Sequence, residues 1–143
     1  MPRQRGQAGM ESALHRSMKE RASRELEREG YSVFFEPPSS PSRFMSWGAY
    51  RPDVFGVRTG AETQDYALVE CETRPSGRRL GSKDFRSVRL QAQLNREPAL
   101  RMILVIPRGT LGRLEPSLRL TWETWVFGEG GVLRLPRALP PAH

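Results

Sequence analysis

Three acidic residues in two apolar segments are the side chains of this sequence best placed to do chemistry. Asp53 lies in the segment 51–57, and Glu70 and Glu72 lie in the segment 67–73, which reads Ala-Leu-Val-Glu-Cys-Glu-Thr. Side chains alternate between the faces of a strand, so Glu70 and Glu72 project from the same face. Like charges placed close together in an apolar sheet destabilise it unless a positive charge offsets them, and a divalent cation is the usual solution. The pattern therefore predicts a metal site, and hard carboxylate oxygens favour Mg²⁺ or Mn²⁺.

An alternative is that the three carboxylates face solvent on a half-exposed hairpin and pair with nearby arginines. A strand this apolar in the middle of a domain is expected to be covered, and covered carboxylates need partners. Other chemistries have less support. The chain has two histidines, His15 and His143, which argues against histidine-rich zinc sites and Ser-His-acid triads. The single cysteine, Cys71, excludes an internal disulfide and is expected to be a small buried hydrophobe.

The composition favours a polyanionic partner. The 143 residues suffice for one domain and include 23 Lys and Arg against 16 Asp and Glu, for a net charge of +7 and a pI near 10.7. Nucleic acid is the stronger interpretation of this charge, and an anionic membrane surface is the weaker one. All the basic residues except Lys19 and Lys83 are arginines, which bind phosphate through forked hydrogen bonds, although genome composition or a hot habitat explains this bias equally well. Without a secretion signal or a run of ~20 apolar residues, the sequence indicates a cytoplasmic protein with no membrane span.

The N-terminal part of the chain predicts a basic arm followed by an amphipathic helix. Residues 1–7 are basic and are expected to form a loose arm. From about Ala8 to Glu29 an apolar residue recurs every four positions, which predicts a helix with one buried stripe. The stripe consists of Leu14, Met18, Ala22 and Leu26. At ~100° per residue Glu11 falls at the centre of this stripe, so its side chain is expected to point toward the core.

The rest of the pattern predicts a single α/β domain with a mixed sheet flanked by helices. Strands are expected at 31–36, 52–58, 66–73 and 101–107, a second helix at 82–95, and a C-terminal β-hairpin at 122–127 and 132–135, followed by a loose tail at 136–143. The segment 101–107 is continuously apolar, as in a parallel strand covered on both faces. The helix before it would then form a right-handed crossover.

This element order, together with the acidic residues, resembles the PD-(D/E)xK nuclease superfamily, which has a restriction-endonuclease-like αβββαβ core. The matching residues are Pro52-Asp53 and Glu70-x-Glu72 on the expected second and third strands. The resemblance implies that Asp53 and Glu70 bind Mg²⁺. Glu72 stands where most members have a lysine that orients or activates the attacking water, and some restriction endonucleases share this Glu-x-Glu form. Glu72 would be a further ligand or the general base, and Glu11 would be the helix acid that many members place beside the site.

Basic residues around the acidic strands are the candidates for contacts with nucleic acid. Between residues 74 and 101 the chain has eight Lys and Arg residues and two acidic ones. A phosphate backbone held there would pass close to the metal, and a solvated helix face is the alternative. The predicted contacts are Arg51, Arg74, Arg78, Arg79, Lys83 and Arg86. Most members of the superfamily have a lysine ammonium at the position of Glu72, and Lys83 is a weak candidate to supply it in this chain.

Together these features predict a Mg²⁺-dependent DNA endonuclease, structure-selective or repair-type, resembling Holliday junction resolvases. RNA stays open as a substrate because arginines that contact the backbone do not distinguish the two sugars. A homodimer is expected by analogy with small nucleases that cut both strands. The main alternative, motivated by the absent lysine, is a catalytically inactive nuclease-fold module that binds nucleic acid or another protein.

Overall fold

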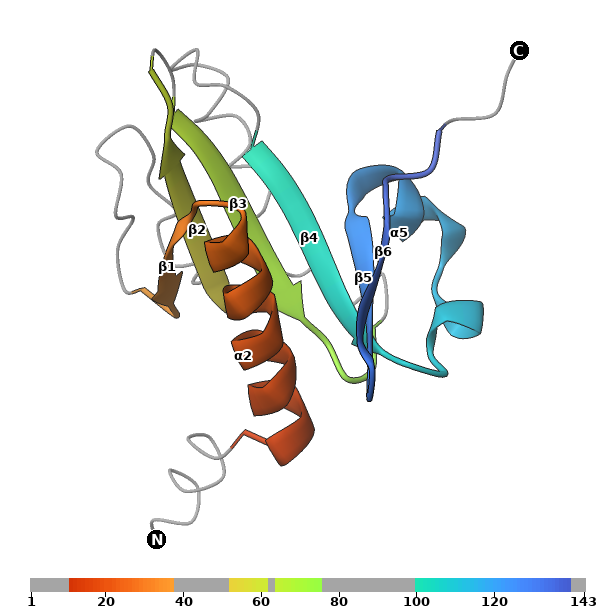
Figure 1. Cartoon of the computed structure of the whole chain (residues 1–143). Coiled ribbons are helices and arrows are strands. Elements are labelled where there is room, and N and C mark those ends of the chain that lie inside the picture. The colour runs from red at the N-terminus through yellow and green to blue at the C-terminus, as the bar shows by residue number, and fades with distance from the viewer. Residues whose placement is uncertain (1–10, 38–51, 62–63, 76–99, 140–143) are drawn as a thin grey trace, which may run out of the picture.

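The computed structural model of the chain describes residues 11–37, 52–61, 64–75 and 100–139 (Figure 1). Within these ranges the helices are α2 (Ala13–Arg28), the short 3-10 helix η1 (Leu111–Arg113) and α5 (Pro116–Thr121). The strands are β1 (Ser32–Phe35), β2 (Val54–Thr59), β3 (Gln64–Cys71), β4 (Leu100–Pro107), β5 (Glu123–Gly128) and β6 (Gly131–Leu135).

The six strands form one mixed sheet in the order β1-β2-β3-β4-β5-β6. β1, β2 and β3 pair antiparallel, β3, β4 and β5 pair parallel, and β6 returns antiparallel to β5. The predictions of an α/β fold with a mixed sheet, of a central parallel strand at 101–107 and of the C-terminal hairpin are confirmed. The helix predicted at 82–95, and with it the crossover between β3 and β4, lies outside the described residues.

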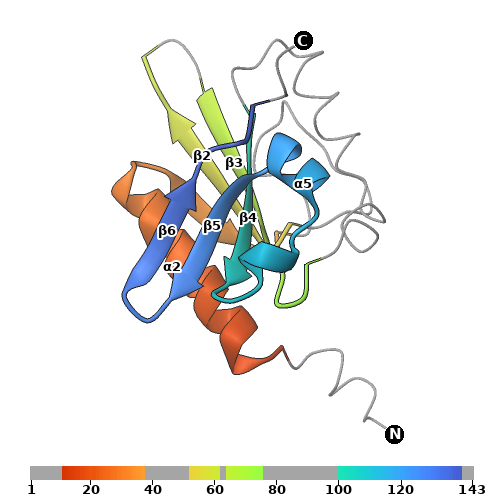
Figure 2. The ribbon, with the colours of Figure 1, turned by 90° about the vertical axis from the view of Figure 1, so that its right-hand side faces the viewer.

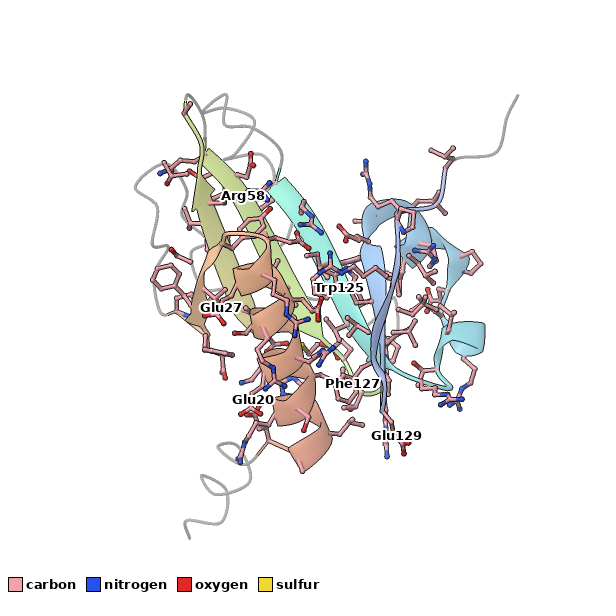
Figure 3. The ribbon with its side chains drawn as sticks, in the orientation of Figure 1. Glu20, Glu27, Arg58, Trp125, Phe127 and Glu129 are labelled. Atoms are coloured by element: carbon pink, nitrogen blue, oxygen red, sulfur yellow. The ribbon has the colours of Figure 1, made fainter. Side chains whose placement is uncertain are left out.

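α2 covers one face of the sheet. Figure 1 shows the helix lying over the strands, and Figure 3 labels Trp125 of β5. Met18, Ala22 and Leu26 of the helix pack with this tryptophan and with Val69 of β3. Trp125 is completely buried and is the largest side chain of this core. The buried contacts hold α2 across the middle of the sheet, so residues near its first turn lie close to the end of β3.

The segment that follows β4 covers the opposite face (Figure 2). Leu114, Leu118 and Trp122 of this segment pack against a core that includes Leu68 of β3 and Leu104 of β4. Since the two cores share β3 and β4, both strands are apolar on both faces, as expected for parallel strands in the middle of a sheet. η1 and α5 were not predicted from the sequence. At three and six residues they are too short to show a helical period.

α2 begins later than the sequence predicts. Ser12 has extended backbone angles and its hydroxyl accepts a hydrogen bond of 3.0 Å from His15 N, so the helix is capped there and starts at Ala13. Glu11 therefore precedes the helix. The prediction that Leu14 is buried is wrong, because this residue is 39% exposed. The sheet contacts the helix farther along, and the buried face includes Lys19 instead. The helix ends at Arg28, close to the predicted end at Glu29, and Gly30 follows with a φ of +91°.

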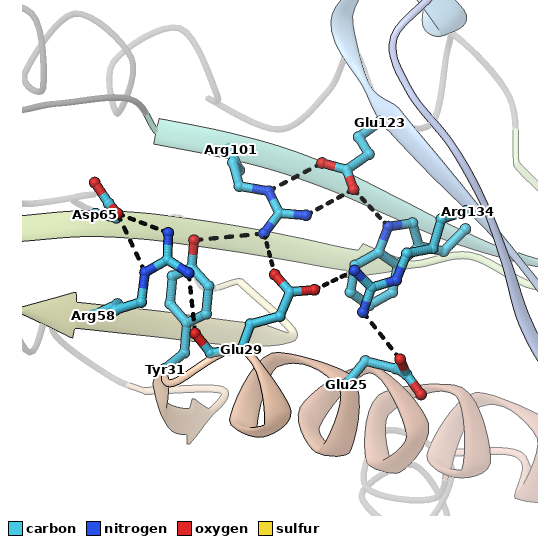
Figure 4. Close-up of polar contacts among 9 residues, drawn as sticks. Glu25, Glu29, Tyr31, Arg58, Asp65, Arg101, Glu123 and Arg134 are labelled. Atoms are coloured by element: carbon cyan, nitrogen blue, oxygen red, sulfur yellow. Dashed lines mark hydrogen bonds and ion pairs between the residues drawn. The ribbon is translucent and has the colours of Figure 1, made fainter.

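The C-terminal half of α2 is fastened to the sheet by a network of ion pairs (Figure 4). The guanidinium of Arg101 on β4 donates to Glu29 at 2.8 Å and to both carboxylate oxygens of Glu123 at 3.0 and 2.7 Å. Arg134 of β6 pairs with Glu29 and, at 3.0 Å, with Glu25. Arg134 also stacks over the ring of Trp125, with its guanidinium carbon 4.3 Å from the ring centroid. This network gives partners to Glu25 and Glu29, which lie off the predicted apolar stripe.

The C-terminal residues 136–139 form no helix or strand, and the backbone of Pro136 and Ala138 is hydrogen-bonded to Arg119 of α5. None of the helices described is both long enough and apolar enough to cross a lipid bilayer.

Candidate active site

Asp53 and Glu70 meet at the end of the β2–β3 hairpin. The antiparallel register pairs Val54 with Val69, and extending it by one residue places Asp53 opposite Glu70. The backbone N–H of Asp53 donates to Glu70 Oε2 at 3.3 Å, and the Cys71 N–H donates to Asp53 Oδ2 at 2.8 Å. Glu70 is fully buried, and Asp53 is 16% exposed. The hairpin thus brings Asp53 and Glu70 into contact at the carboxyl end of β3, with the Asp53 side chain partly exposed.

Glu72 follows directly after β3 and is 4% exposed. Its N–H donates to the Val105 carbonyl at 2.9 Å, which keeps the chain extended along β4. By strand alternation Glu72 lies on the same side as Glu70. Both glutamates have interaction partners. The expectation that the carboxylates are covered rather than solvent-facing is confirmed for Glu70 and Glu72, whereas Asp53 is partly exposed.

His15 joins this group from the first turn of α2. Its Nδ1 lies 2.6 Å from Glu11 Oε2, its Nε2 lies 3.0 Å from the Cys71 carbonyl oxygen, and Nε2 is 3.5 Å from Asp53 Oδ2. A carboxylate and a carbonyl can only accept, so both ring nitrogens must donate and the imidazole must be protonated. Asp53 raises the pKa of His15 to about 9, against the effect of burial, and Glu11 adds to the rise. His15 is a cation at neutral pH.

Lys19 extends the network one helical turn farther along α2. Its ammonium lies 3.0 Å from Glu11 Oε2 and 2.5 Å from Glu36 Oε2, and the residue is only 5% exposed. Burial lowers the pKa of Lys19, but the two carboxylates outweigh this and raise it overall. Glu36 has a positive φ of 39° and donates its N–H to the Asp53 carbonyl at 3.0 Å. Carboxylates and cations therefore alternate along the series of contacts that runs Glu36, Lys19, Glu11, His15, Asp53.

Oxygen atoms suited to a hard cation lie together at this point. His15 Nε2 stands between Asp53 Oδ2 and the Cys71 carbonyl oxygen, and Asp53 Oδ1 has no hydrogen-bond partner among the described residues. Within the described ranges, no three His, Cys, Asp or Glu side chains are grouped so as to hold a metal ion. Mg²⁺ keeps several waters and commonly uses one or two protein carboxylates, the number that Asp53 and Glu70 would offer.

The structure places the predicted residues in different ways. Asp53 and Glu70 are in contact, and Glu72 follows two residues after Glu70. Glu11 reaches the site through His15, although it lies before the helix rather than on its buried stripe. Arg74 lies beyond the end of β3. The other predicted nucleic-acid contacts, Arg51, Arg78, Arg79, Lys83 and Arg86, lie outside the described residues.

His15 and Lys19 are the site residues that the sequence did not reveal. The chain places Glu11, His15 and Lys19 four residues apart, a spacing that puts side chains on one side of a helix. That spacing of an acid and two bases is the signal that could have found them. His15 does not pair with the Cys71 thiol but with its backbone carbonyl.

Comparison of the chain with models of protein families, with curated proteins and with solved structures gave no match. Function is therefore inferred from the geometry of the site.

Proposed function

We propose that the protein is a Mg²⁺-dependent DNA endonuclease with a restriction-endonuclease-like fold, hydrolysing phosphodiester bonds at the site formed by Asp53 and Glu70. The observation that carries the proposal is the contact between these residues at the carboxyl end of β3, where Asp53 N lies 3.3 Å from Glu70 Oε2. The order α2-β1-β2-β3, followed by a strand parallel to β3, agrees with the superfamily core. The net charge of +7 agrees with a polyanionic substrate.

Asp53 and Glu70 would hold the metal through their carboxylate oxygens. A bound Mg²⁺ would polarise the phosphodiester and lower the pKa of a coordinated water, which supplies the nucleophile near neutral pH. Glu72, on the same side of the chain as Glu70, would accept a proton from that water or add a ligand. The Cys71 N–H and the His15 imidazolium both contact Oδ2 of Asp53 and would hold its carboxylate in place.

His15 and Lys19 would supply positive charge that the superfamily usually takes from a lysine two residues after the second acid. In this chain that position is Glu72. Lys19 lies one helical turn from His15, and Glu11 contacts both. Positive charge thus reaches the site from α2 rather than from β3, which supports catalytic competence despite the substitution.

The proposal is tested by cleavage of a panel of duplex, branched and single-stranded DNA and of RNA, with Mg²⁺ or with EDTA. Asp53→Asn and Glu70→Gln should each lower the cleavage rate on the order of 100-fold or more, as expected when a group that stabilises transition-state charge is removed. Asp65→Asn is the matched control, because Asp65 lies on the same hairpin at its far end and pairs with Arg58 at 2.8 Å. If the wild-type protein cuts none of these substrates and binds no divalent metal, the proposal fails.

The alternative function is a nuclease-fold module that binds nucleic acid or a protein without cutting. The cations of the site favour this alternative, because Lys19 pairs with both Glu11 and Glu36 while His15 lies against Asp53. Positive charge supplied by the protein itself reduces the need for a metal. Calorimetric titration with Mn²⁺ separates the two: binding that Asp53→Asn abolishes supports the nuclease, and its absence in the wild type supports the module.

A further inference from the structure

A hollow of about 500 Å³ lies beside the candidate active site, between the chain that leaves β3 and the chain that leaves β4. The described residues that line it are Thr73, Arg74, Pro75, Thr110 and Arg113. β3 and β4 are parallel, so their carboxyl ends open at the same edge of the sheet. This edge is where open α/β sheets bind ligands, and Glu72 directly precedes the first lining residue.

The turn after β4 brings Arg113 to this edge. Gly109 has a φ of +94°, a backbone conformation that favours glycine, and the Thr110 N–H closes the turn on the Pro107 carbonyl at 3.2 Å. The Thr110 hydroxyl donates to the same carbonyl at 2.8 Å, so its hydrogen is used within the turn. η1 starts immediately afterwards and carries Arg113 as its last residue.

Among the described residues, the lining of the hollow is positively charged without an acidic counterpart. Arg74 and Arg113 are both exposed, no carboxylate is among the described residues that line the hollow, and neither guanidinium forms an ion pair within the described structure. Arg101 shows the opposite situation, since Glu29 and Glu123 saturate its guanidinium. Arg74 and Arg113 therefore retain their forked donors for an external anion.

A second hollow that holds arginines, between α2 and the β5–β6 turn, lacks this property. Acidic residues line it together with the basic ones; its charged lining consists of Glu20, Arg21, Arg24, Arg108 and Glu129. Arg21 is also 3.2 Å from Glu25. The hollow after β3 and β4 is thus the stronger anion site.

We propose that Arg74 and Arg113 bind one backbone phosphate of the nucleic acid, next to the phosphodiester that is cut, with the Thr73 hydroxyl as a further donor. The identity of the molecule that carries the phosphate rests on the proposed function. Arg74 is two residues beyond Glu72, roughly 7 Å of extended chain. A strand whose phosphate is held there passes the carboxylates at the carboxyl end of β3, so the arginine pair would set which bond enters the site.

The test is fluorescence anisotropy of labelled DNA in EDTA, so that no cutting occurs, over a series of salt concentrations. Arg74→Ala and Arg113→Ala are compared with Arg137→Ala, which removes another exposed arginine that lines a different hollow with Leu100 and Thr121. Each pocket variant should weaken binding about tenfold, as expected for lost charge-assisted hydrogen bonds, and should lower the slope of log affinity against log salt by about 1. Arg137→Ala should change affinity by less than about twofold. Arg113→Lys, which keeps the charge but not the fork, should recover only part of the loss.

The outcomes separate the inference from the proposed function. If the wild type binds and cuts DNA but the pocket variants behave like Arg137→Ala, the phosphate pocket is wrong and the nuclease stands. If the wild type binds no nucleic acid, the nuclease fails, and NMR of the arginine Nε–Hε groups during titration with inorganic phosphate decides the pocket alone. Shifts at Arg74 and Arg113 that Arg113→Ala abolishes support it, and unchanged signals overturn it. Thermal melting of each variant confirms that it is folded.

Discussion

The Nε2 atom of His15 lies 3.5 Å from Oδ2 of Asp53. This contact joins α2, which carries His15, to the acidic residue that precedes β2. The same nitrogen donates to the Cys71 carbonyl at 3.0 Å, and Asp53 accepts from the Cys71 N–H at 2.8 Å. The imidazolium is thus the cation that offsets a carboxylate at the end of a buried hairpin. It links the packing of α2 directly to the geometry of the proposed metal ligands.

This relationship predicts a pH dependence of stability in the metal-free protein. His15 has a pKa of about 9 when folded against an ordinary value of 6.5, so its contribution is fully present below pH ~6.5 and is lost as pH rises through about 9. Urea unfolding in EDTA should show wild-type stability falling by about 2 kcal/mol across this window relative to His15→Gln. Equal pH profiles for the two proteins would contradict the protonated state of His15.

Glu29 predicts a loss of stability on the acid side. Burial raises its pKa, but hydrogen bonds from Arg101 and Arg134 outweigh this and lower it below 4.5. A depressed pKa stabilises the fold above about pH 4.5, and this stabilisation disappears as pH falls through the folded value. Glu29→Gln should destabilise the protein at pH 7 by about 2 kcal/mol, because two guanidinium groups lose a partner. The variant should also lose less stability than the wild type as the pH falls below about 4.5.

Asp65→Asn is the control for the Glu29 variant, since the Arg58–Asp65 pair is more than one-third exposed on both sides. Its cost should be below about 1 kcal/mol. A cost for Glu29→Gln no larger than this would show that the network in Figure 4 contributes no more than a surface pair.

Cys71 should be chemically silent in the folded protein. The residue is 1% exposed, and burial, together with the negative charges of Asp53 and Glu70, raises the pKa of its thiol well above 9.0. Both effects suppress the thiolate that reacts with disulfide reagents. Labelling with a chromogenic disulfide at pH 8 should proceed only at the rate of unfolding and become rapid in urea. Rapid labelling of the native protein would place the end of β3 at the surface, contrary to the structure.

Gly56 should not tolerate even an alanine. A Cβ there would lie 3.0 Å from Cδ1 and 3.2 Å from Cβ of Tyr31, whose ring also supports the guanidinium of Arg58 at 4.6 Å. Gly56→Ala should therefore destabilise the protein by about 1–3 kcal/mol through overpacking. Gly130→Ala, where no neighbouring atom lies within 4 Å, should change stability by less than about 0.5 kcal/mol. Equal urea midpoints for the two variants would show that Tyr31 moves freely.

The features predicted correctly from the sequence have a local cause. The apolar run 101–107 identifies a central strand, and the alternation around Asp53 and Glu70 identifies the hairpin that joins them. His15 was not predicted as a site residue, because two histidines argue against histidine-rich zinc sites and Ser-His-acid triads. Its role depends on how α2 packs against the end of β3, 56 residues away.

The errors share this non-local origin. Leu14 continues the apolar period of α2 but lies beyond the part of the helix that the sheet covers, so it is exposed. Lys19 breaks that period and is buried, because Glu11 and Glu36 satisfy its charge. Arg113 lies outside the arginine-rich stretch and reaches the edge of the sheet through the turn after β4. Such placements follow from tertiary contacts that no helical or strand period records.

The central claim is that Asp53 and Glu70 share a divalent metal. The most direct test is a crystal structure of the protein soaked in Mn²⁺, with anomalous data. The account predicts an anomalous peak ~2.1 Å from a carboxylate oxygen of Asp53 and at a similar distance from one of Glu70, and its disappearance in Asp53→Asn crystals. Ordered carboxylates without a peak between them at saturating Mn²⁺ would contradict it.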